Sequence, residues 1–457
     1  MKTVVLLSSI VMSVALWPVL ADAANGSVPP VDLEQRYREA VQRYEHTLQE
    51  LQQRLEALES QSGGSAGPER PAATGELEET VLDLADEVES LQTEIEDIQT
   101  EAARLSINLY VTLEYENFRK TTQTFDAKRV ELLIGAQLTD RIKAFTEIEF
   151  ERTATTESGP RQGAVEVEQG WLEYDINPWI RPRFGVMLVP FGRFNLEHFD
   201  PVRDLTARPI AMRRIVPTTW AEAGAGFTGS PFLGGNLEGT IFDELSVDYQ
   251  FYLMNGLTNG ISDTSTRGAR GAFGRDNNAN KAFVGRVQVN LLPGIEIGGS
   301  GYVGTYDASG RTMSGFDADW KLFAGPWELI GEYAWFDLEN GGTQRGNPTL
   351  TVPNSLHGGY AQVNYHFWFE GLDSTFLGRG FDDPTFTGIV RYGHAHISDD
   401  NDAGAGANKE GRVTIGLNYR PVETVAFKME YQFNHTKNEA LERGDLNGFI
   451  ASVTGAF

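Results

Sequence analysis

The sequence has no cysteine, which excludes disulfide bonds and thiolate metal sites. After the first two dozen residues it also lacks any apolar run near the roughly 18 residues that a membrane-spanning helix needs. Basic residues are scarce, 38 against 64 acidic ones, and the formal net charge is −26. A nucleic-acid partner, whose phosphates require a basic surface, is therefore not expected. If the protein spans a membrane, it does so with β-strands.

The first 23 residues have the pattern of a secretory signal. Lys2 is followed by the apolar run 4–20 and then by the small-x-small triplet 21–23. We expect cleavage after Ala23, so that the mature chain begins near Ala24. A short membrane anchor is the alternative interpretation.

Apolar residues follow a seven-residue repeat through most of the stretch 24–105. Residues 60–75, rich in Ser, Gly and Pro, interrupt the repeat and are interpreted as a linker. Repeats sustained over several heptads predict helices that pack as a coiled coil. Two arrangements stay open, a hairpin within the chain and a three-stranded bundle on the axis of a trimer. An amphipathic helix that lies on another surface is the alternative to a coiled coil. The repeat positions are Tyr37, Val41, Tyr44, Leu48, Leu51, Leu55, Leu58, Leu77, Val81, Leu84, Val88, Leu91, Ile95, Ile98, Ala102 and Leu105.

From Ser106 onward the hydrophobic period changes to two. Ile107, Leu109 and Val111, for example, alternate with polar residues. This alternation predicts a strand with one apolar and one polar face. The pattern recurs to the end of the chain and gives sixteen candidate strands. They lie near 106–116, 127–138, 142–152, 164–176, 180–188, 220–229, 245–254, 282–291, 295–306, 315–324, 326–337, 357–369, 384–397, 413–420, 425–434 and 447–457.

The connections between these strands alternate between tight turns, such as Asn177-Pro178, and long polar loops, such as 255–281. Such alternation, with Trp and Tyr near the strand ends, is typical of transmembrane barrels. A soluble β-sandwich also alternates but rarely sustains strands of about ten residues with aromatic ends. We therefore predict an all-β transmembrane barrel of about 16 antiparallel strands over 106–457, preceded by an α-helical coiled-coil segment.

The chain ends on Phe457, with Phe449, Ala451 and Val453 on the same strand face. A terminal aromatic residue after alternating apolar residues looks like the signal that outer-membrane barrels present to their assembly machinery. It places the protein in the outer membrane of a Gram-negative cell, with residues 24–105 in the periplasm. The expected partners are membrane lipid, lipopolysaccharide, the barrel assembly machinery and two further copies of the chain in a homotrimer. Peptidoglycan is a further candidate partner of the helices.

The connection 189–219 is the best candidate for a segment that folds inward and narrows the pore. It is net positive in an acidic protein, because it contains five arginines and three acidic residues. Guanidinium groups bind phosphate or carboxylate through paired hydrogen bonds, so these arginines are predicted to favour anions. Alternatively, salt bridges to the neighbouring acids or to the barrel wall neutralise them, and they only fix the loop. The candidates are Arg193, Arg203, Arg208, Arg213 and Arg214, opposed by Glu197, Asp200 and Asp204.

Three acidic residues on one strand, Glu147, Glu149 and Glu151, are predicted to face the lumen. They would repel anions on that side of the pore. Opposed acidic and basic walls create a transverse field, as in general porins. This interpretation competes with anion selectivity.

The stretch around the predicted constriction carries a family resemblance. A strand leads into Gly185 and then into Pro190-Phe191-Gly192, a long Asp- and Arg-rich stretch and a Gly-rich strand follow, and the similarity is concentrated in 185–229. This arrangement resembles the phosphate-selective porin O/P family. The resemblance implies a porin barrel with anion selectivity.

Other polar groups carry weaker hypotheses. His394 and His396 share a strand face ahead of three aspartates, which allows a divalent-cation site, although a solvated outer loop explains the same residues. His198 and Asp200 could be catalytic partners, but the sequence has neither a nucleophile elbow nor an HExxH motif. We therefore expect no enzyme, no cofactor and no metal.

The sequence predicts an outer-membrane porin that lets small hydrophilic solutes diffuse passively, with a preference for anions such as phosphate or dicarboxylates. A general or sugar-specific porin is the alternative within the transport class. A barrel that serves only to anchor a tether to the cell wall is the alternative from another class.

Overall fold

The computed structural model forms two compact units, one made mainly of the residues before Asn108 and one made mainly of those that follow. The predicted signal 1–23 and most of the linker 60–75 lie outside the described residues. The described residues are 31–62, 81–95, 104–119, 121–152, 163–217, 219–233, 245–271, 273–274, 276–398, 408–436 and 447–457.

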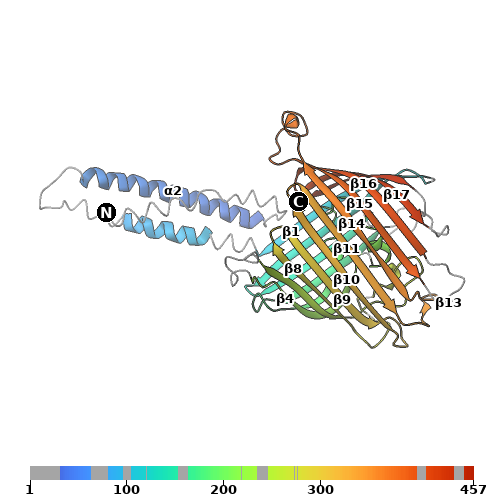
Figure 1. Ribbon diagram of the computed structural model, residues 1–457. Helices are drawn as coiled ribbons and strands as arrows, with labels where there is room; N and C mark the ends of the chain where they lie inside the picture. The colour runs from blue at the N-terminus through green and yellow to red at the C-terminus, as the bar shows by residue number, and fades with distance from the viewer. Residues whose placement is uncertain are drawn as a thin grey trace. The chain divides into compact units, whose positions relative to one another are not determined.

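Two helices lie in the described part of the first unit and pack against each other (Figure 1). Helix α2 spans Val31–Ser62, and a second helix covers 81–95. Arg43, in the first half of α2, forms an ion pair of 2.8 Å with Glu94 at the end of the second helix, so the two helices are antiparallel. The heptads thus build a hairpin within the chain. Its core consists of Tyr44, Leu51, Leu84, Val88 and Leu91.

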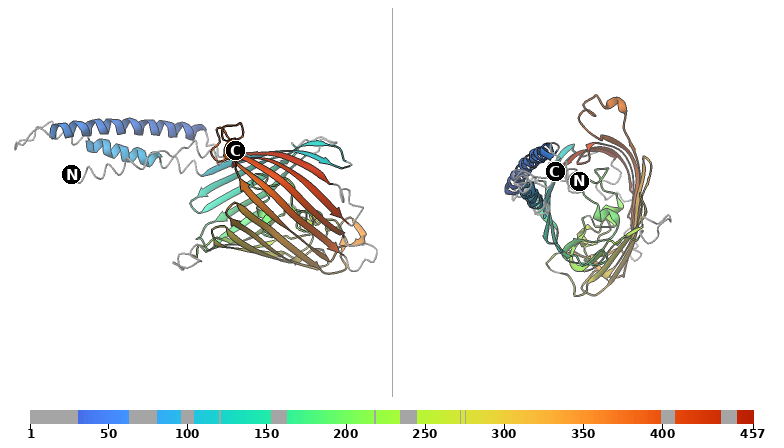
Figure 2. Two further views of the ribbon diagram at one scale, coloured as in Figure 1. Left: turned by 45° about the horizontal axis from the view of Figure 1, so that its top comes forward. Right: turned by 90° about the vertical axis from the view of Figure 1, so that its left-hand side faces the viewer.

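Sixteen strands close into one barrel, seen end-on in Figure 2. Consecutive barrel strands lie next to each other, and β1 closes the ring by pairing antiparallel with β18. Closure removes the free sheet edges that could not be satisfied in lipid. The strands are β1 (Leu105–Phe118), β2 (Thr124–Thr139), β3 (Ile142–Glu151), β4 (Ala164–Tyr174), β5 (Arg181–Leu188), β6 (Ala221–Gly229), β7 (Ser246–Met254), β8 (Ala282–Leu292), β9 (Ile295–Thr305), β10 (Thr312–Ala324), β11 (Trp327–Leu338), β14 (Ser355–Phe367), β15 (Thr385–Ser398), β16 (Asn408–Val422), β17 (Val425–Thr436) and β18 (Gly448–Ala456). All sixteen predicted strands are confirmed.

Each strand has the two faces that its sequence predicts. On β17, Phe427 is 47% exposed on the outer surface, whereas the neighbouring Lys428 is 2% exposed inside the barrel. An apolar outer face suits lipid, and the polar groups collect inside. In the part of the chain that the structure describes, no helix is both long and apolar enough to cross a membrane.

The connections alternate in length with four exceptions, of which two are short connections, 119–123 and 306–311, at the end that otherwise carries long loops. Turns such as 140–141, 293–294 and 423–424 join strands at the end where β1 begins and β18 ends. Two connections at that same end, 230–245 and 368–384, are much longer than the predicted short turns. The opposite end carries the long loops, and one of these contains the separate sheet of β12 (Thr343–Gln344) and β13 (Asn347–Thr351).

The connection from β5 to β6, residues 189–220, folds into the barrel, as the end-on view of Figure 2 shows. Phe191 and Trp220 of this connection are fully buried against Phe336 of β11 and Tyr302 of β9. Burying an aromatic side chain of this size stabilises by roughly 1.5–3 kcal/mol. Apolar packing therefore helps to hold the inward segment against the barrel wall.

Candidate functional site

The two ends of the inward segment are tied together by one side chain. The amide of Val189 donates to the carbonyl of Trp220 at 2.8 Å. Asn195 Nδ2 donates to the carbonyls of Val189 and Trp220, each at 2.9 Å, and Asn195 Oδ1 accepts from the Trp220 amide at 2.9 Å. Because these groups are buried, water cannot replace the asparagine. Asn195 thus fixes the position from which the segment enters the lumen.

Replacing Asn195 by alanine should loosen the segment. Each buried group that loses its hydrogen-bond partner costs about 1–3 kcal/mol. The inward conformation of the segment therefore becomes less stable. We expect a higher and noisier single-channel conductance, measured in planar bilayers. Asn280→Ala, which removes an exposed asparagine from an outer loop, is the matched control. Native conductance in Asn195→Ala would contradict this role.

Gly192 lets the segment approach the barrel wall. Its φ is +77°, and a Cβ there would lie 1.8 Å from Glu332 Oε1 of β11, so no other residue fits. The Gly192 amide donates to Ser300 Oγ at 3.1 Å, and the Phe194 amide donates to Glu332 Oε2 at 2.8 Å. The backbone of this turn, and not only its side chains, is bound to the wall.

Arg193 is the first residue of the short helix α4 (Arg193–Leu196). Its guanidinium group forms ion pairs with three carboxylates. Its guanidinium lies 2.6 Å from Glu296, 2.9 Å from Glu197 and 3.2 Å from Asp319, and its side chain is 3% exposed. It lines a smaller cavity of about 270 Å³. The arrangement fastens the segment to the wall and leaves Arg193 little capacity to bind a solute.

The other four predicted arginines lie together on a larger cavity of about 650 Å³ inside the barrel. Its lining contains nine cationic side chains and seven carboxylates, although the chain as a whole carries a net charge of −26. The lining is thus locally positive. The cations are Lys128, Arg129, Arg203, Arg208, Arg213, Arg214, Arg267, Arg270 and Arg412, and the acids are Glu114, Glu116, Glu149, Glu151, Glu166, Glu168 and Glu410.

The four arginines have different partners. Arg203 pairs with Asp200, and Arg214, the last residue of α5 (Ala211–Arg214), lies 3.1 Å from Glu410. Arg213 is exposed to the cavity. Arg208 donates to Thr219 Oγ1 at 3.1 Å and forms no ion pair with any carboxylate among the described residues. The predicted salt bridges to neighbouring acids or to the wall therefore form at Arg203 and Arg214 but not at Arg208.

Asp200 and Arg208 of the inward segment are both ionised at neutral pH. Burial raises the pKa of Asp200, but Arg203 and Arg129 outweigh it and hold that pKa well below its usual range. Burial, followed by the nearby Arg129 and Arg203, lowers the pKa of Arg208 to about 10. Arg208 therefore still carries its positive charge at neutral pH.

The predicted acidic wall is divided. Glu149 and Glu151 line the large cavity, and Glu149 forms an ion pair of 3.2 Å with Arg129. Glu147 is fully buried and lies outside that lining, next to His198 of the inward segment. Further acids of β1 and β4 complete the wall, so carboxylates from neighbouring strands face the same cavity as the arginines.

Sequence reasoning did not include several lining residues. Arg412 follows the inward parity of β16, because Val413 and Ile415 face outward, and this signal could have found it. Arg267 and Arg270 come from the loop 255–281, where no periodicity reveals orientation.

The histidine pair predicted as a possible cation site lies on another surface. His394 and His396 occupy the outward parity of β15, and His396 Nδ1 lies 2.8 Å from His357 Nε2 of β14. The aspartates at 399, 400 and 402 lie outside the described residues.

A family model matches the part of the chain that forms the barrel and the inward segment. The sequence profile of the phosphate-selective porin O and P proteins matches residues 106–455. The chain belongs to the phosphate-selective porin O and P family. It is therefore an outer-membrane porin, a channel for passive diffusion of small solutes, as the resemblance predicted.

Individual relatives of this porin are distant. An uncharacterised protein of Aquifex aeolicus (strain VF5) is 26% identical over 379 residues, covering 77% of this chain and 80% of that protein. The structure of Salmonella typhi OmpF in complex with daunomycin matches with a TM-score of 0.53 at 12% identity, covering 77% of this chain and 97% of that one, and shares the barrel fold. The anion-selective porin from Comamonas acidovorans has a TM-score of 0.46 at 11% identity, covering 77% of this chain and 100% of that one.

Proposed function

We propose that the porin selects small anions such as phosphate or dicarboxylates, and that the arginines of the inward segment are its filter. The observation that carries the proposal is the lining of the large cavity, where cations outnumber carboxylates nine to seven in an acidic chain. Fixed positive charge beside a water-filled path lowers the free energy of an anion there and raises that of a cation. Solutes pass unchanged in this account, without enzymatic activity or a cofactor.

Arg208 is the residue expected to contact the solute most directly. A planar guanidinium offers paired N–H donors that match a phosphate or carboxylate edge. Arg208 donates one hydrogen bond to Thr219 and forms no ion pair with a carboxylate among the described residues. Arg203 and Arg214 share their charge with acids and contribute mainly to the field around the path.

A phosphate block experiment tests this role. Phosphate added to a chloride solution should reduce the chloride current through the native porin, because the slower, doubly charged anion occupies the same site. The Arg208→Gln variant should need several-fold more phosphate for half-block, since it loses the charge-assisted hydrogen bonds. Arg379→Gln, an exposed arginine of the connection 368–384, is the control. Equal block in Arg208→Gln and native porin would overturn the assignment.

Acidification should strengthen the anion preference. Glutamate carboxylates in general take up protons as the pH falls toward 4, whereas guanidinium groups keep their charge. Arg208, with a pKa lowered to about 10, is charged throughout this range. We expect the chloride-to-potassium permeability ratio to rise several-fold between pH 8 and pH 4.

The double variant Glu116→Gln/Glu151→Gln should show part of that increase already at pH 8, because both residues line the cavity. A permeability ratio that falls on acidification would show that the acidic wall does not oppose the anions.

The two competing functions make different predictions. The acidic wall that shares the cavity favours a general porin, which would show little preference for either ion and no block by phosphate. A sugar-specific porin would be blocked by linear oligosaccharides. A structural tether would give no measurable conductance, because the inward segment would close the lumen.

The remaining assignments are proposals of the same kind. We propose that residues 1–23 direct export and that residues 24–105 lie in the periplasm, since the chain enters β1 at the end of the barrel that carries the tight turns. We also propose that the porin forms a homotrimer and contacts lipopolysaccharide and the assembly machinery. The helical hairpin is proposed to contact peptidoglycan. Crosslinking of the porin in intact cells would test the trimer.

A further inference from the structure

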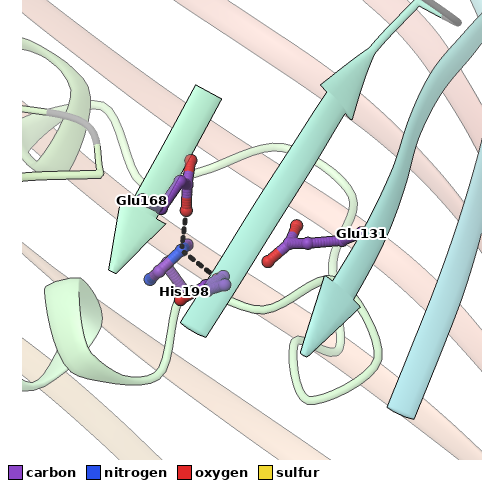
Figure 3. A group of neighbouring side chains, drawn as sticks. Glu131, Glu168 and His198 are labelled. Carbon is purple, nitrogen blue, oxygen red and sulfur yellow. Dashed lines mark hydrogen bonds and ion pairs between the residues drawn. The ribbon is translucent and has the colours of Figure 1, made fainter. Parts of the chain in front are cut away.

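Four buried ligand-type side chains converge between the inward segment and the barrel wall. They are Glu131 of β2, Glu147 of β3, Glu168 of β4 and His198 of the inward segment, and one ligand atom from each lies within 4.8 Å of all the others. Figure 3 shows Glu131, Glu168 and His198 turned toward one another from separate elements. All four side chains are at most 4% exposed. They come from three adjacent strands and the inward segment, so only the folded barrel brings them together.

The imidazole of His198 is oriented as a ligand would be. Its Nδ1 lies 2.9 Å from the carbonyl of Asn195, which can only accept, so Nδ1 carries the proton. Its Nε2 points at the acids, 3.2 Å from Glu168 Oε2 and 4.0 Å from Glu147 Oε1. A metal-binding histidine almost always donates its other ring N–H to a fixed acceptor in this way.

Two of the three carboxylates, Glu131 and Glu147, are held through one oxygen and have acceptor capacity left on the other. Glu131 Oε2 accepts from the Tyr110 hydroxyl, and Glu147 Oε2 accepts from Gln169 Nε2 at 2.5 Å. The second oxygens, Glu131 Oε1 and Glu147 Oε1, are buried and have no hydrogen-bond donor among the described residues. Buried acceptors without a donor are costly, and a cation at the centre of the cluster would satisfy both.

Nearby cations do not balance the cluster. Arg129 Nη1 lies 3.8 Å from Glu131, but the same guanidinium lies 3.2 Å from Glu149 and 3.2 Å from Asp200. The guanidinium of Arg129 is therefore shared among several carboxylates and does not balance the three acids of the cluster. Mixed imidazole and carboxylate ligands suit a first-row divalent transition metal better than Mg²⁺ or Ca²⁺, which take oxygen ligands.

We propose that Glu131, Glu147, Glu168 and His198 bind one divalent transition-metal ion, with Zn²⁺ as the probe, and that the ion fastens the inward segment to strands β2, β3 and β4. Ligands about 2.1 Å from a tetrahedral ion lie about 3.4 Å from one another, so a small contraction of the cluster suffices. His198 precedes Asp200, which pairs with Arg203. The ion would thus also hold the start of the arginine-bearing stretch in place.

The test measures metal content and does not depend on anion selectivity. Full-length porin, folded in detergent and stripped with a chelator, is incubated with Zn²⁺ in excess Mg²⁺ and passed over a desalting column. We expect one equivalent of Zn²⁺ per chain by mass spectrometry of the metal. We also expect Zn²⁺ to raise the temperature at which the folded barrel unfolds in detergent.

Two variants locate the ion. His198→Ala and the nearly isosteric Glu131→Gln should retain less than a tenth of an equivalent, and Zn²⁺ should no longer shift their unfolding temperature. His394→Ala, which removes an outward histidine of β15, should behave like the native porin. If the native porin takes up no Zn²⁺, or if both cluster variants keep a full equivalent, the proposal is overturned and shared protons hold the cluster. Because the readout is metal content, either result leaves the anion proposal to its own test.

Discussion

Replacing Arg203, Arg208, Arg213 and Arg214 together by alanine should abolish the anion preference of the porin and turn it toward cations. The variant leaves five cationic side chains against seven carboxylates in the lining of the large cavity, in place of nine against seven. A unit charge about 8 Å from an ion in water contributes roughly 0.5 kcal/mol. Four charges therefore change the anion-to-cation permeability ratio by an order of magnitude or more.

The reversal potential under a salt gradient measures this change. A matched variant that removes four arginines elsewhere, Arg54, Arg141, Arg345 and Arg379, loses the same net charge without touching the cavity lining. It should keep the native preference. If both variants shift the potential equally, total charge governs the channel and the arginine segment does not. An unchanged potential in the cavity variant would assign the four arginines a purely structural role.

Replacing Arg193 by alanine should destabilise the porin strongly. The change leaves Glu296 and Asp319 of the wall, with Glu197 of the segment, without the guanidinium that pairs with all three. Removing one partner of a buried ion pair costs about 3–5 kcal/mol. Arg286 still reaches Asp319, so we expect the lower part of that range.

The temperature at which the folded barrel unfolds in detergent measures the loss. Arg379→Ala, which removes an exposed arginine, should leave that temperature within a degree or two of native. Folded Arg193→Ala channels recorded at low temperature should keep their anion preference, because Arg193 lies outside the lining of the large cavity. A native unfolding temperature combined with lost anion preference would reverse the roles assigned to Arg193 and Arg208.

The strands were predictable because their signal is local. Each lipid-crossing strand must alternate an apolar outer face with a polar inner face, so residues such as Phe427 and Lys428 of β17 reveal their orientation without knowledge of any partner. The strands also pair with their neighbours in the chain, which makes the order of a closed barrel simple. The heptads of the N-terminal segment are local in the same sense, but only the structure shows that the helices form a hairpin.

The division of labour among the arginines was not predictable. Arg193 and Arg208 are both arginines of the same connection. The local sequence around them does not indicate which one pairs with the barrel wall and which one faces the cavity. The partners of Arg193 lie on β9 and β10, about a hundred residues away, and only the fold brings them together. The cluster around His198 could not be predicted from the sequence either, because its three acids come from three different strands.

The central claim is that the lumen favours anions although the chain is acidic. The most direct test is the zero-current potential of single native channels in a planar bilayer under a potassium chloride gradient. The account predicts a potential whose sign shows that chloride crosses more readily than potassium. A potential of the opposite sign would show that the acidic wall governs the pore, and the porin would then be a general one whose arginines fix the inward segment.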